Sequence, residues 1–267
     1  MRQAATTVLL AMSASLLALA AGCVTTTTET PSSPAGSQTV ETDQPRNRAR
    51  IHTELASLYF TRGSMAVALD ELRIAVAADD TYAQAHAMFG MVYMTLRENK
   101  PAQASFERAL ELAPNDPDIN HNFGWFLCQT ERAPEASRYF LQAVKNPLYE
   151  TPWRSYSAAG VCALRAGNAK DAENYFQLAL KLEPDEPTAL LQLAQIRYRQ
   201  NSLDEARKLV SRLNRLLAPT AESLWLALRI ERKLGERVAE QSFAIQLRRR
   251  FPGSAEYLAL QRGEYDK

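Results

Sequence analysis

The sequence has little glycine, few β-type alternations and almost no charge excess, and each shortage excludes a class of protein. Only 10 of its 267 residues are glycine, which is about half the usual share of about 7%. Long Val/Ile/Thr alternations are missing while alanine and leucine dominate. This argues against a β-sandwich or barrel and favours helices. The formal net charge is only +1, so we expect no nucleic-acid binding, which needs a basic surface.

The residues that usually carry catalysis or bind metals are also scarce. The three histidines, His52, His86 and His121, form no HxxxH pattern, and no CxxC pair is present. Neither GxSxG, GxGxxG nor a phosphate loop occurs. Carboxylates are scattered over expected exposed helix faces. We therefore expect packed, solvated or hydrogen-bonded histidines, no metal, no cofactor and no enzymatic activity.

Residues 1–22 are expected to be a signal peptide. Arg2 is their only charge, an apolar run follows it, and small residues precede Cys23. This layout resembles a bacterial lipoprotein signal, in which the cysteine becomes the lipidated first residue, although Ala20 stands where leucine is usual. An ordinary secretory signal with an incidental cysteine is the alternative. Val24 follows the cysteine, and by the same resemblance the absence of aspartate there favours the outer membrane.

The segment after the signal is rich in threonine, serine and proline. It cannot bury enough apolar surface to offset its ordering entropy. We expect residues 23–48 to be the lipidated cysteine and a disordered tether. No later stretch is apolar enough to span a bilayer.

Residues 49–267 show a 34-residue period. The expected units, with a two-residue insertion in the third, are 49–82, 83–116, 117–152, 153–186, 187–220 and 221–254, followed by a C-terminal tail. In the first five units, position 8 is glycine or alanine (Ala56, Gly90, Gly124, Gly160 and Ala194). Position 20 is always alanine (Ala68, Ala102, Ala136, Ala172 and Ala206). Position 24 is large and apolar (Leu72, Phe106, Phe140, Phe176 and Val210).

These columns resemble the tetratricopeptide repeat, which implies a right-handed α-solenoid of six helix pairs. Small residues at positions 8 and 20 let the paired helices approach closely, and position 24 is expected to insert a side chain between units. Position 15 holds Gly63, Gly167, Gly235 and Asn201, where a turn with positive φ is expected. The sixth unit loses the small residues, so its packing pair is predicted to be Ala239 and Phe243. A terminal unit is expected to be atypical.

Cys128 and Cys162 occupy positions 12 and 10 of neighbouring units. Their first helices should lie about 8–10 Å apart, which permits disulfide geometry. An oxidising periplasm favours a bond between them. Two buried free thiols remain the alternative.

The first helices should present positions 2, 5, 9 and 12 to the concave side of the solenoid. Thr53 and Ser57 in the first unit do not match the lysine and asparagine of the repeats that clamp a terminal carboxylate. Large apolar residues occupy positions 9 and 12 of several units instead, and an exposed apolar stripe is typical of a binding site. We expect a partner-binding groove formed by Phe60, Met91, Met94 and Trp125, with Trp125 as its anchor. Tyr198 occupies position 12 in the fifth unit, as Phe60 and Met94 do in the first two. Packing of single members against neighbouring helices is the alternative.

Local segments are similar to one family of repeat lipoproteins. They lie at residues 120–129 (NHNFGWFLCQ), 145–149 (KNPLY), 160–167 (GVCALRAG), 221–235 and 246–254. Together with the lipobox, tether and six repeats they resemble the PilF/PilW family of type IV pilus biogenesis lipoproteins, the pilotins. The resemblance implies a non-enzymatic scaffold at the inner leaflet of the outer membrane that binds the pilus secretin and promotes its localisation and multimerisation. Alternatives are a repeat lipoprotein of the β-barrel assembly machinery and an adaptor for periplasmic peptidoglycan enzymes.

Overall fold

The fold is an array of helices, as the repeat pattern predicts. The computed structural model describes residues 38–265, and thirteen helices without any strand are found in that part of the chain. Residues from Val40 onward form one unit. The helices are α1 (Gln38–Thr61), α2 (Met65–Ala78), α3 (Ala83–Thr95), α4 (Asn99–Leu112), α5 (Pro117–Gln129), α6 (Ala133–Ala143), α7 (Pro152–Arg165), α8 (Ala169–Leu182), α9 (Pro187–Arg199), α10 (Leu203–Leu216), α11 (Ala221–Leu234), α12 (Arg237–Arg250) and α13 (Ala255–Arg262).

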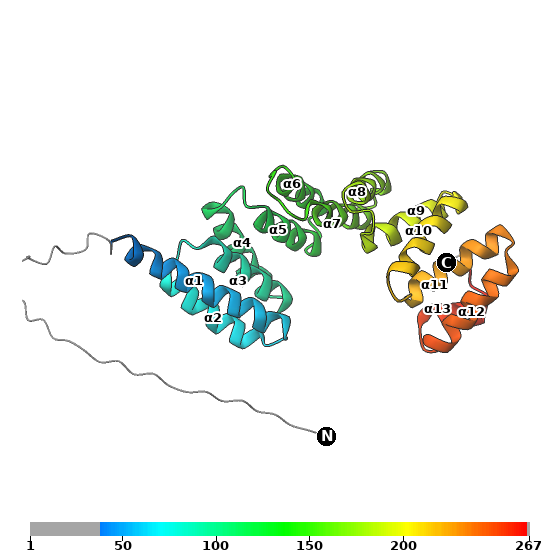
Figure 1. Ribbon diagram of the computed structural model, residues 1–267, viewed down its shortest axis with the longest axis horizontal. Coiled ribbons are helices and arrows are strands. Elements are labelled where there is room, and N and C mark those ends of the chain that lie inside the picture. The colour runs from blue at the N-terminus through cyan, green and yellow to red at the C-terminus, as the bar shows by residue number, and fades with distance from the viewer. Residues whose placement is uncertain (1–37, 266–267) are drawn as a thin grey trace, which may run out of the picture. The chain divides into compact units, whose positions relative to one another are not determined.

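Six consecutive helix pairs, α1–α2 to α11–α12, follow one another in a curved row (Figure 1). The helices α3, α5, α9 and α11 begin where their repeat units are expected to begin, and α7 begins one residue before Trp153. In the view of Figure 1, α6 and α8 lie along the upper edge, while α5 and α7 lie on the lower side, toward which the row curves. The first helices therefore line the inner side of the row. None of the helices in residues 38–265 is long and apolar enough to cross a membrane.

The expected tether boundary is wrong at its C-terminal end. Helix α1 begins at Gln38 and continues through Pro45, so residues 38–48 are helical rather than part of the tether. The C-terminal part of this segment contacts the array: Arg46 lies 3.6 Å from Asp79 and over the ring of Tyr82, and the adjoining Ala49 is fully buried. These contacts anchor a segment whose polar composition alone does not predict a helix. Residues 1–37, with Cys23 and the expected signal peptide, lie outside the described residues.

Close packing of glycine against phenylalanine holds the second, third and fourth helix pairs together. A Cβ atom added at Gly90 or Gly160 would lie 2.7 or 2.6 Å from the ring of Phe106 or Phe176, and at Gly124 it would lie 3.0 Å from Phe140. The first and fifth pairs have alanine at position 8 and the smaller Leu72 or Val210 at position 24, all of them buried. Position 24 therefore contacts position 8 of its own unit. Phe106 also reaches the next unit, with ring centroids 5.8 and 5.6 Å from Phe123 and Phe126.

The turn within each helix pair has positive φ at position 15 in all six units. The expected residues Gly63, Gly167, Gly235 and Asn201 have φ between 61° and 80°. Arg97 and Glu131 adopt the same conformation, each with φ of 62°. Left-handed backbone disfavours a residue with a Cβ, so the repeat geometry imposes this turn even where the local sequence opposes it.

The last helix pair packs differently from the expected register slip. Leu228 and Leu247 are fully buried in one cluster, whereas Ala239 and Phe243 are only half-buried. Phe243 therefore packs on the core but stays partly accessible. The fully buried contact of α12 is made by Leu247 instead, because Leu228 replaces the small residue at position 8. Helix α13 contacts both α11 and α12, and Tyr265 stacks on Trp225 with centroids 5.6 Å apart. This C-terminal segment covers the end of the array.

Candidate protein-binding groove

The four residues expected to form the groove lie on the first helices of the first three units. Phe60, Met91, Met94 and Trp125 are all half-buried. Phe60 packs against the cluster around Ala56 and Leu72, and the other three pack against the cluster around Phe106, Phe123 and Phe140. Each side chain therefore contacts the core on one side and keeps part of its surface accessible. We call these four residues the apolar stripe.

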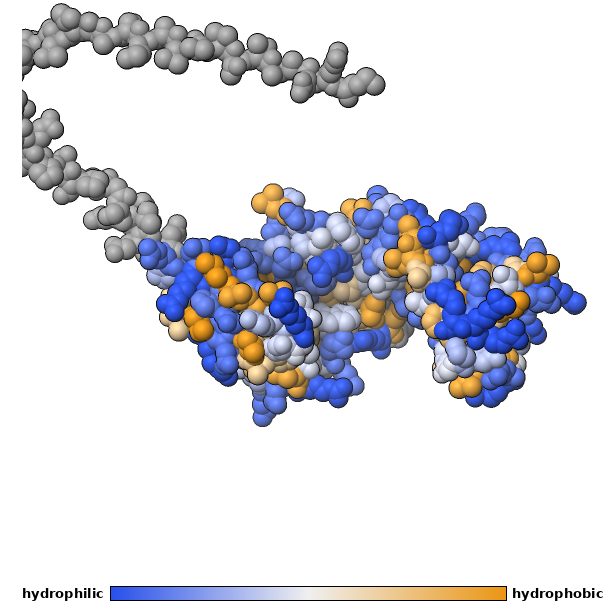
Figure 2. All heavy atoms as spheres, turned by 60° about the horizontal axis from the view of Figure 1, so that its bottom comes forward, coloured by the Kyte–Doolittle hydropathy of each residue, from blue (hydrophilic) through white to orange (hydrophobic). Residues whose placement is uncertain are grey.

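Trp125 has a charged neighbour from the next unit. The guanidinium of Arg165 on α7 lies 5.4 Å from the centroid of the Trp125 ring and donates a hydrogen bond to Gln129 (3.1 Å). Trp125 thus lies where α5 and α7 meet. The face drawn in Figure 2 is mostly hydrophilic, with small apolar patches at both ends of the row and between them.

Tyr198, at position 12 of the fifth unit, is more deeply buried than the residues of the apolar stripe. It is only 5% exposed, because Arg229 and Lys233 of α11 lie over its ring at 4.6 and 4.4 Å from the centroid. Tyr198 is therefore a buried ring and not an accessible residue of the groove. Its ring forms part of a separate pocket between α9 and α11.

The two cysteines of the repeat region form a disulfide between the third and fourth units. Cys128 of α5 and Cys162 of α7 are bonded, with their Cα atoms 5.7 Å apart and a sequence separation of 34. Both are buried. The bond joins the two units on either side of the loop 144–151, which contains the two-residue insertion.

The same loop is held by a polar chain that runs through a partly buried histidine. Tyr149 of the loop hydrogen-bonds through its hydroxyl to Ser155 Oγ (3.1 Å), and Ser155 Oγ is 2.9 Å from His121 Nδ1 on α5. His52 Nδ1 lies 2.6 Å from a Glu71 oxygen, and His86 Nε2 bonds the Asp80 carbonyl (2.9 Å). No group of three metal-ligating side chains occurs within residues 38–265. These histidines have the structural roles that their isolated positions in the sequence suggest.

We expect His121 to make the fold sensitive to mild acid. Burial, aided by the nearby Arg154 charge, lowers the pKa of His121 to about 4 from its ordinary value of 6.5. Between these values the unfolded chain binds a proton that the folded chain does not, so stability falls as pH drops from about 6.5 to 4, by on the order of 2–3 kcal/mol in total. Denaturant melts at pH 7 and pH 4.5 should show a smaller loss in His121→Asn than in the unaltered chain.

The control for this expectation is His86→Asn, which should keep the pH dependence of the unaltered chain. An identical pH dependence in all three proteins would show that His121 does not cause the acid sensitivity.

Comparisons with known proteins match both the repeats and the whole chain. Tetratricopeptide-repeat models match residues 83–116 and 163–229. The type IV pilus assembly protein PilF of Pseudomonas aeruginosa is 30% identical over 241 residues, which cover 90% of this chain and 92% of that protein. The chain belongs to the PilF/PilW family of tetratricopeptide-repeat proteins of type IV pilus biogenesis.

Two solved structures of the family have the same fold. The structure of PilW, described as a widely conserved type IV pilus biogenesis factor, has a TM-score of 0.72 at 30% identity and covers 80% of this chain and 98% of its own. A structure of P. aeruginosa PilF has a TM-score of 0.77 at 28% identity, covering 82% and 99%. These structures confirm the predicted all-α repeat fold. Tetratricopeptide repeats are typically scaffolds for protein interaction, and nothing in the comparisons indicates catalysis.

The sequence interpretation missed the charged residues of the first helices in the last two units. Arg199 and Arg229 occupy positions 13 and 9 of their units and line the pocket next to Tyr198. Arg229 would have been found if positions 2, 5, 9 and 12 had been inspected in the fifth and sixth units for charged as well as apolar residues.

Proposed function

We propose that this protein is an outer-membrane lipoprotein that binds the type IV pilus secretin and promotes its localisation and multimerisation in the outer membrane. The observation that carries the proposal is the relation to PilF, which spans nearly the full length of both chains. The structure agrees with a scaffold role, since its curved row of helix pairs places partly exposed apolar side chains on the first helices.

The proposed anchor is a lipid on Cys23. Residues 24–37, which precede α1, separate this cysteine from the helical array. Combined lipid chains hold a protein at a membrane far more firmly than one acyl chain. The array is thereby kept at the periplasmic side of the outer membrane, where the secretin must assemble.

The apolar stripe is the proposed contact surface for the secretin. Met91 and Met94 are flexible and adapt to varied partner shapes, and Trp125 offers a large aromatic anchor. Because these side chains also pack on the core, alanine variants would lose stability as well as contact area. Glutamine at Met91 and Met94 keeps the length of the side chain and removes its apolar surface.

We expect M91Q/M94Q to bind secretin at least ten-fold more weakly than the unaltered protein, measured by titration with the purified periplasmic part of the secretin. The matched control is L178Q/L182Q, which alters two exposed leucines of α8, 41% and 49% accessible, on the other side of the row. Equal binding by both variants, with unchanged melting, would show that the apolar stripe is not the contact surface.

A pull-down from membranes separates this function from the alternatives. Recovery of the secretin supports the proposal. Recovery of a β-barrel assembly component or a peptidoglycan enzyme, without secretin, would favour one of the other scaffold roles and contradict it.

A further inference from the structure

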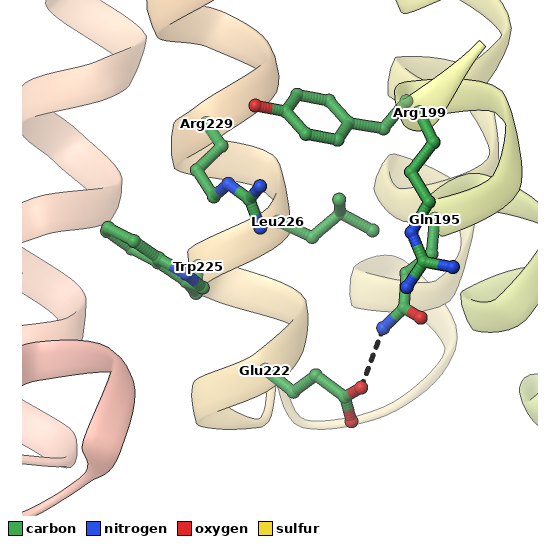
Figure 3. A pocket seen from close by; sticks show the side chains of 7 residues that line it. Gln195, Arg199, Glu222, Trp225, Leu226 and Arg229 are labelled. Carbon is green, nitrogen blue, oxygen red and sulfur yellow. Dashed lines mark hydrogen bonds between the residues drawn. The ribbon is translucent and has the colours of Figure 1, made fainter. Parts of the chain in front are cut away.

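A pocket separate from the apolar stripe lies in the fifth and sixth units, toward the other end of the array. It has a volume of about 240 Å³ and is formed where α9 and α11 meet (Figure 3). Its lining combines aromatic, aliphatic and charged side chains: Gln195, Tyr198, Arg199, Glu222, Trp225, Leu226 and Arg229. These are first-helix residues of the fifth and sixth units, so the pocket opens on the face that the repeats use for partners.

Arg229 is held in the pocket by aromatic rings rather than by a carboxylate. Its guanidinium carbon lies 4.6 Å from the ring centroid of Tyr198 and 5.9 Å from that of Trp225. Its Nε atom is buried and has no hydrogen-bond partner among the described residues. A buried donor of a charged group that makes no hydrogen bond is costly. The Arg229 guanidinium thus has no fixed acceptor for this donor among the described residues, and it is the whole guanidinium that a ligand acceptor would meet.

The charges around Arg229 favour an anionic acceptor. Arg199 lines the same pocket from α9, and in the view of Figure 3 its side chain ends beside Gln195. Lys233 lies 4.4 Å from the Tyr198 ring centroid. Residues 38–265 contain no ion-pair partner for Arg199, Arg229 or Lys233. The one acid in the lining, Glu222, lies at the other end of the pocket from Arg229 and accepts a hydrogen bond from Gln195 (2.7 Å).

We propose that this pocket binds a carboxylate of a partner polypeptide, with an apolar side chain beside the carboxylate. Arg229 would donate to the carboxylate, as guanidinium groups do in fork-shaped contacts, and Arg199 would add a second positive charge. Trp225 and Leu226 would contact the neighbouring apolar side chain. Glu222 would accept from a backbone N–H of the same extended segment.

The carboxylate has two sources in a polypeptide, a side chain and the chain terminus. The volume admits about one residue with its flanking atoms, since a water molecule in the liquid occupies about 30 Å³. Both sources therefore fit the pocket, and peptides distinguish them. This proposal rests on the proposed function only in that the chain works by binding a protein.

The test uses the purified lipid-free protein and three short peptides, so it does not depend on the secretin. The first has an acetylated N-terminus, Ala-Leu-Asp-Leu-Ala and an amidated C-terminus. The second replaces its aspartate by asparagine. The third is acetyl-Ala-Ala-Ala-Leu with a free C-terminal carboxylate. Binding is followed by two-dimensional NMR through the indole N–H of Trp225, which the spectrum of W225F assigns.

We expect at least one carboxylate peptide to shift the Trp225 signal and to bind five-fold or more tightly than the asparagine peptide. The peptide that binds identifies the source of the carboxylate. Arg229→Gln should abolish the difference between charged and neutral peptides, and Arg199→Gln should reduce it. The control Arg248→Gln alters an exposed arginine in the last turn of α12 and should change nothing.

Equal binding of the charged and neutral peptides, or no shift of Trp225 at millimolar peptide, would overturn the proposal. Should Arg229→Gln melt early, Arg199→Gln decides the outcome, because Arg199 is exposed and its loss leaves the packing intact. A negative result here, with secretin captured normally, removes this pocket and leaves the proposed function in place. If the peptides bind but secretin is not captured, the proposed function is contradicted and the proposal for this pocket stands.

Discussion

Removing the disulfide between Cys128 and Cys162 is expected to lower the free energy of unfolding by about 2–4 kcal/mol. The bond closes a loop of 34 residues, and in the chain-entropy account a cross-link of this span restricts the unfolded chain by about 4 kcal/mol. It also joins two units whose connecting loop has two extra residues. The double variant Cys128→Ala/Cys162→Ala should therefore reach its guanidinium midpoint at a clearly lower concentration.

Reduction provides the control for this expectation. Dithiothreitol should lower the midpoint of the unaltered repeat region and leave that of the double variant unchanged. Thiol titration of the denatured, non-reduced repeat region should find no free thiol. Two titratable thiols, or equal midpoints with and without reductant, would show that the bond does not form.

Adding one methyl group at Gly160 is expected to destabilise the fourth helix pair by about 1–3 kcal/mol, as overpacking of a filled core does. The new Cβ would lie 2.6 Å from the Phe176 ring, and Phe176 is fully buried. Helix propensity alone predicts the opposite, a gain of about 1 kcal/mol for alanine over glycine. Gly160→Ala should therefore lower the denaturant midpoint, because the fully buried ring must shift to admit the methyl group.

A second substitution should reverse this loss. Phe176→Leu with Gly160→Ala recreates the alanine–leucine pair of the first unit, Ala56 with Leu72. Although Phe176→Leu alone should be destabilising through the cavity it leaves, the double variant should be more stable than Gly160→Ala. If Gly160→Ala stabilises the protein, or if the two effects simply add, the two residues are not in the tight contact described.

Much of the fold could be predicted because the closest contacts recur every 34 residues. Gly90, Gly124 and Gly160 align because each meets a phenylalanine ring of its own unit, and that constraint is visible in a single sequence. The turn at Arg97 and Glu131 follows from the register although neither residue favours it. The relative height of Cys128 and Cys162 also follows from the register, which is why their pairing could be anticipated.

Contacts that do not recur from one repeat unit to the next could not be predicted in this way. The helical segment before Ala49 contains Arg46, which reaches Asp79 and Tyr82 in the loop after α2. The burial of Tyr198 depends on two cations of the next unit, which no column of the repeat specifies. The sixth unit has its own packing around Leu247, because the single helix α13 packs against this cluster where the other units meet a helix pair.

The central claim, that this protein brings the secretin to the outer membrane as a multimer, is tested most directly by fractionating membranes from cells with and without it. We expect heat-resistant secretin multimers in the outer-membrane fraction of cells that contain the protein. Cells that lack it should contain secretin monomers or multimers outside that fraction, and re-expression should restore the first pattern. Unchanged multimers in the outer membrane of cells without the protein would contradict the account.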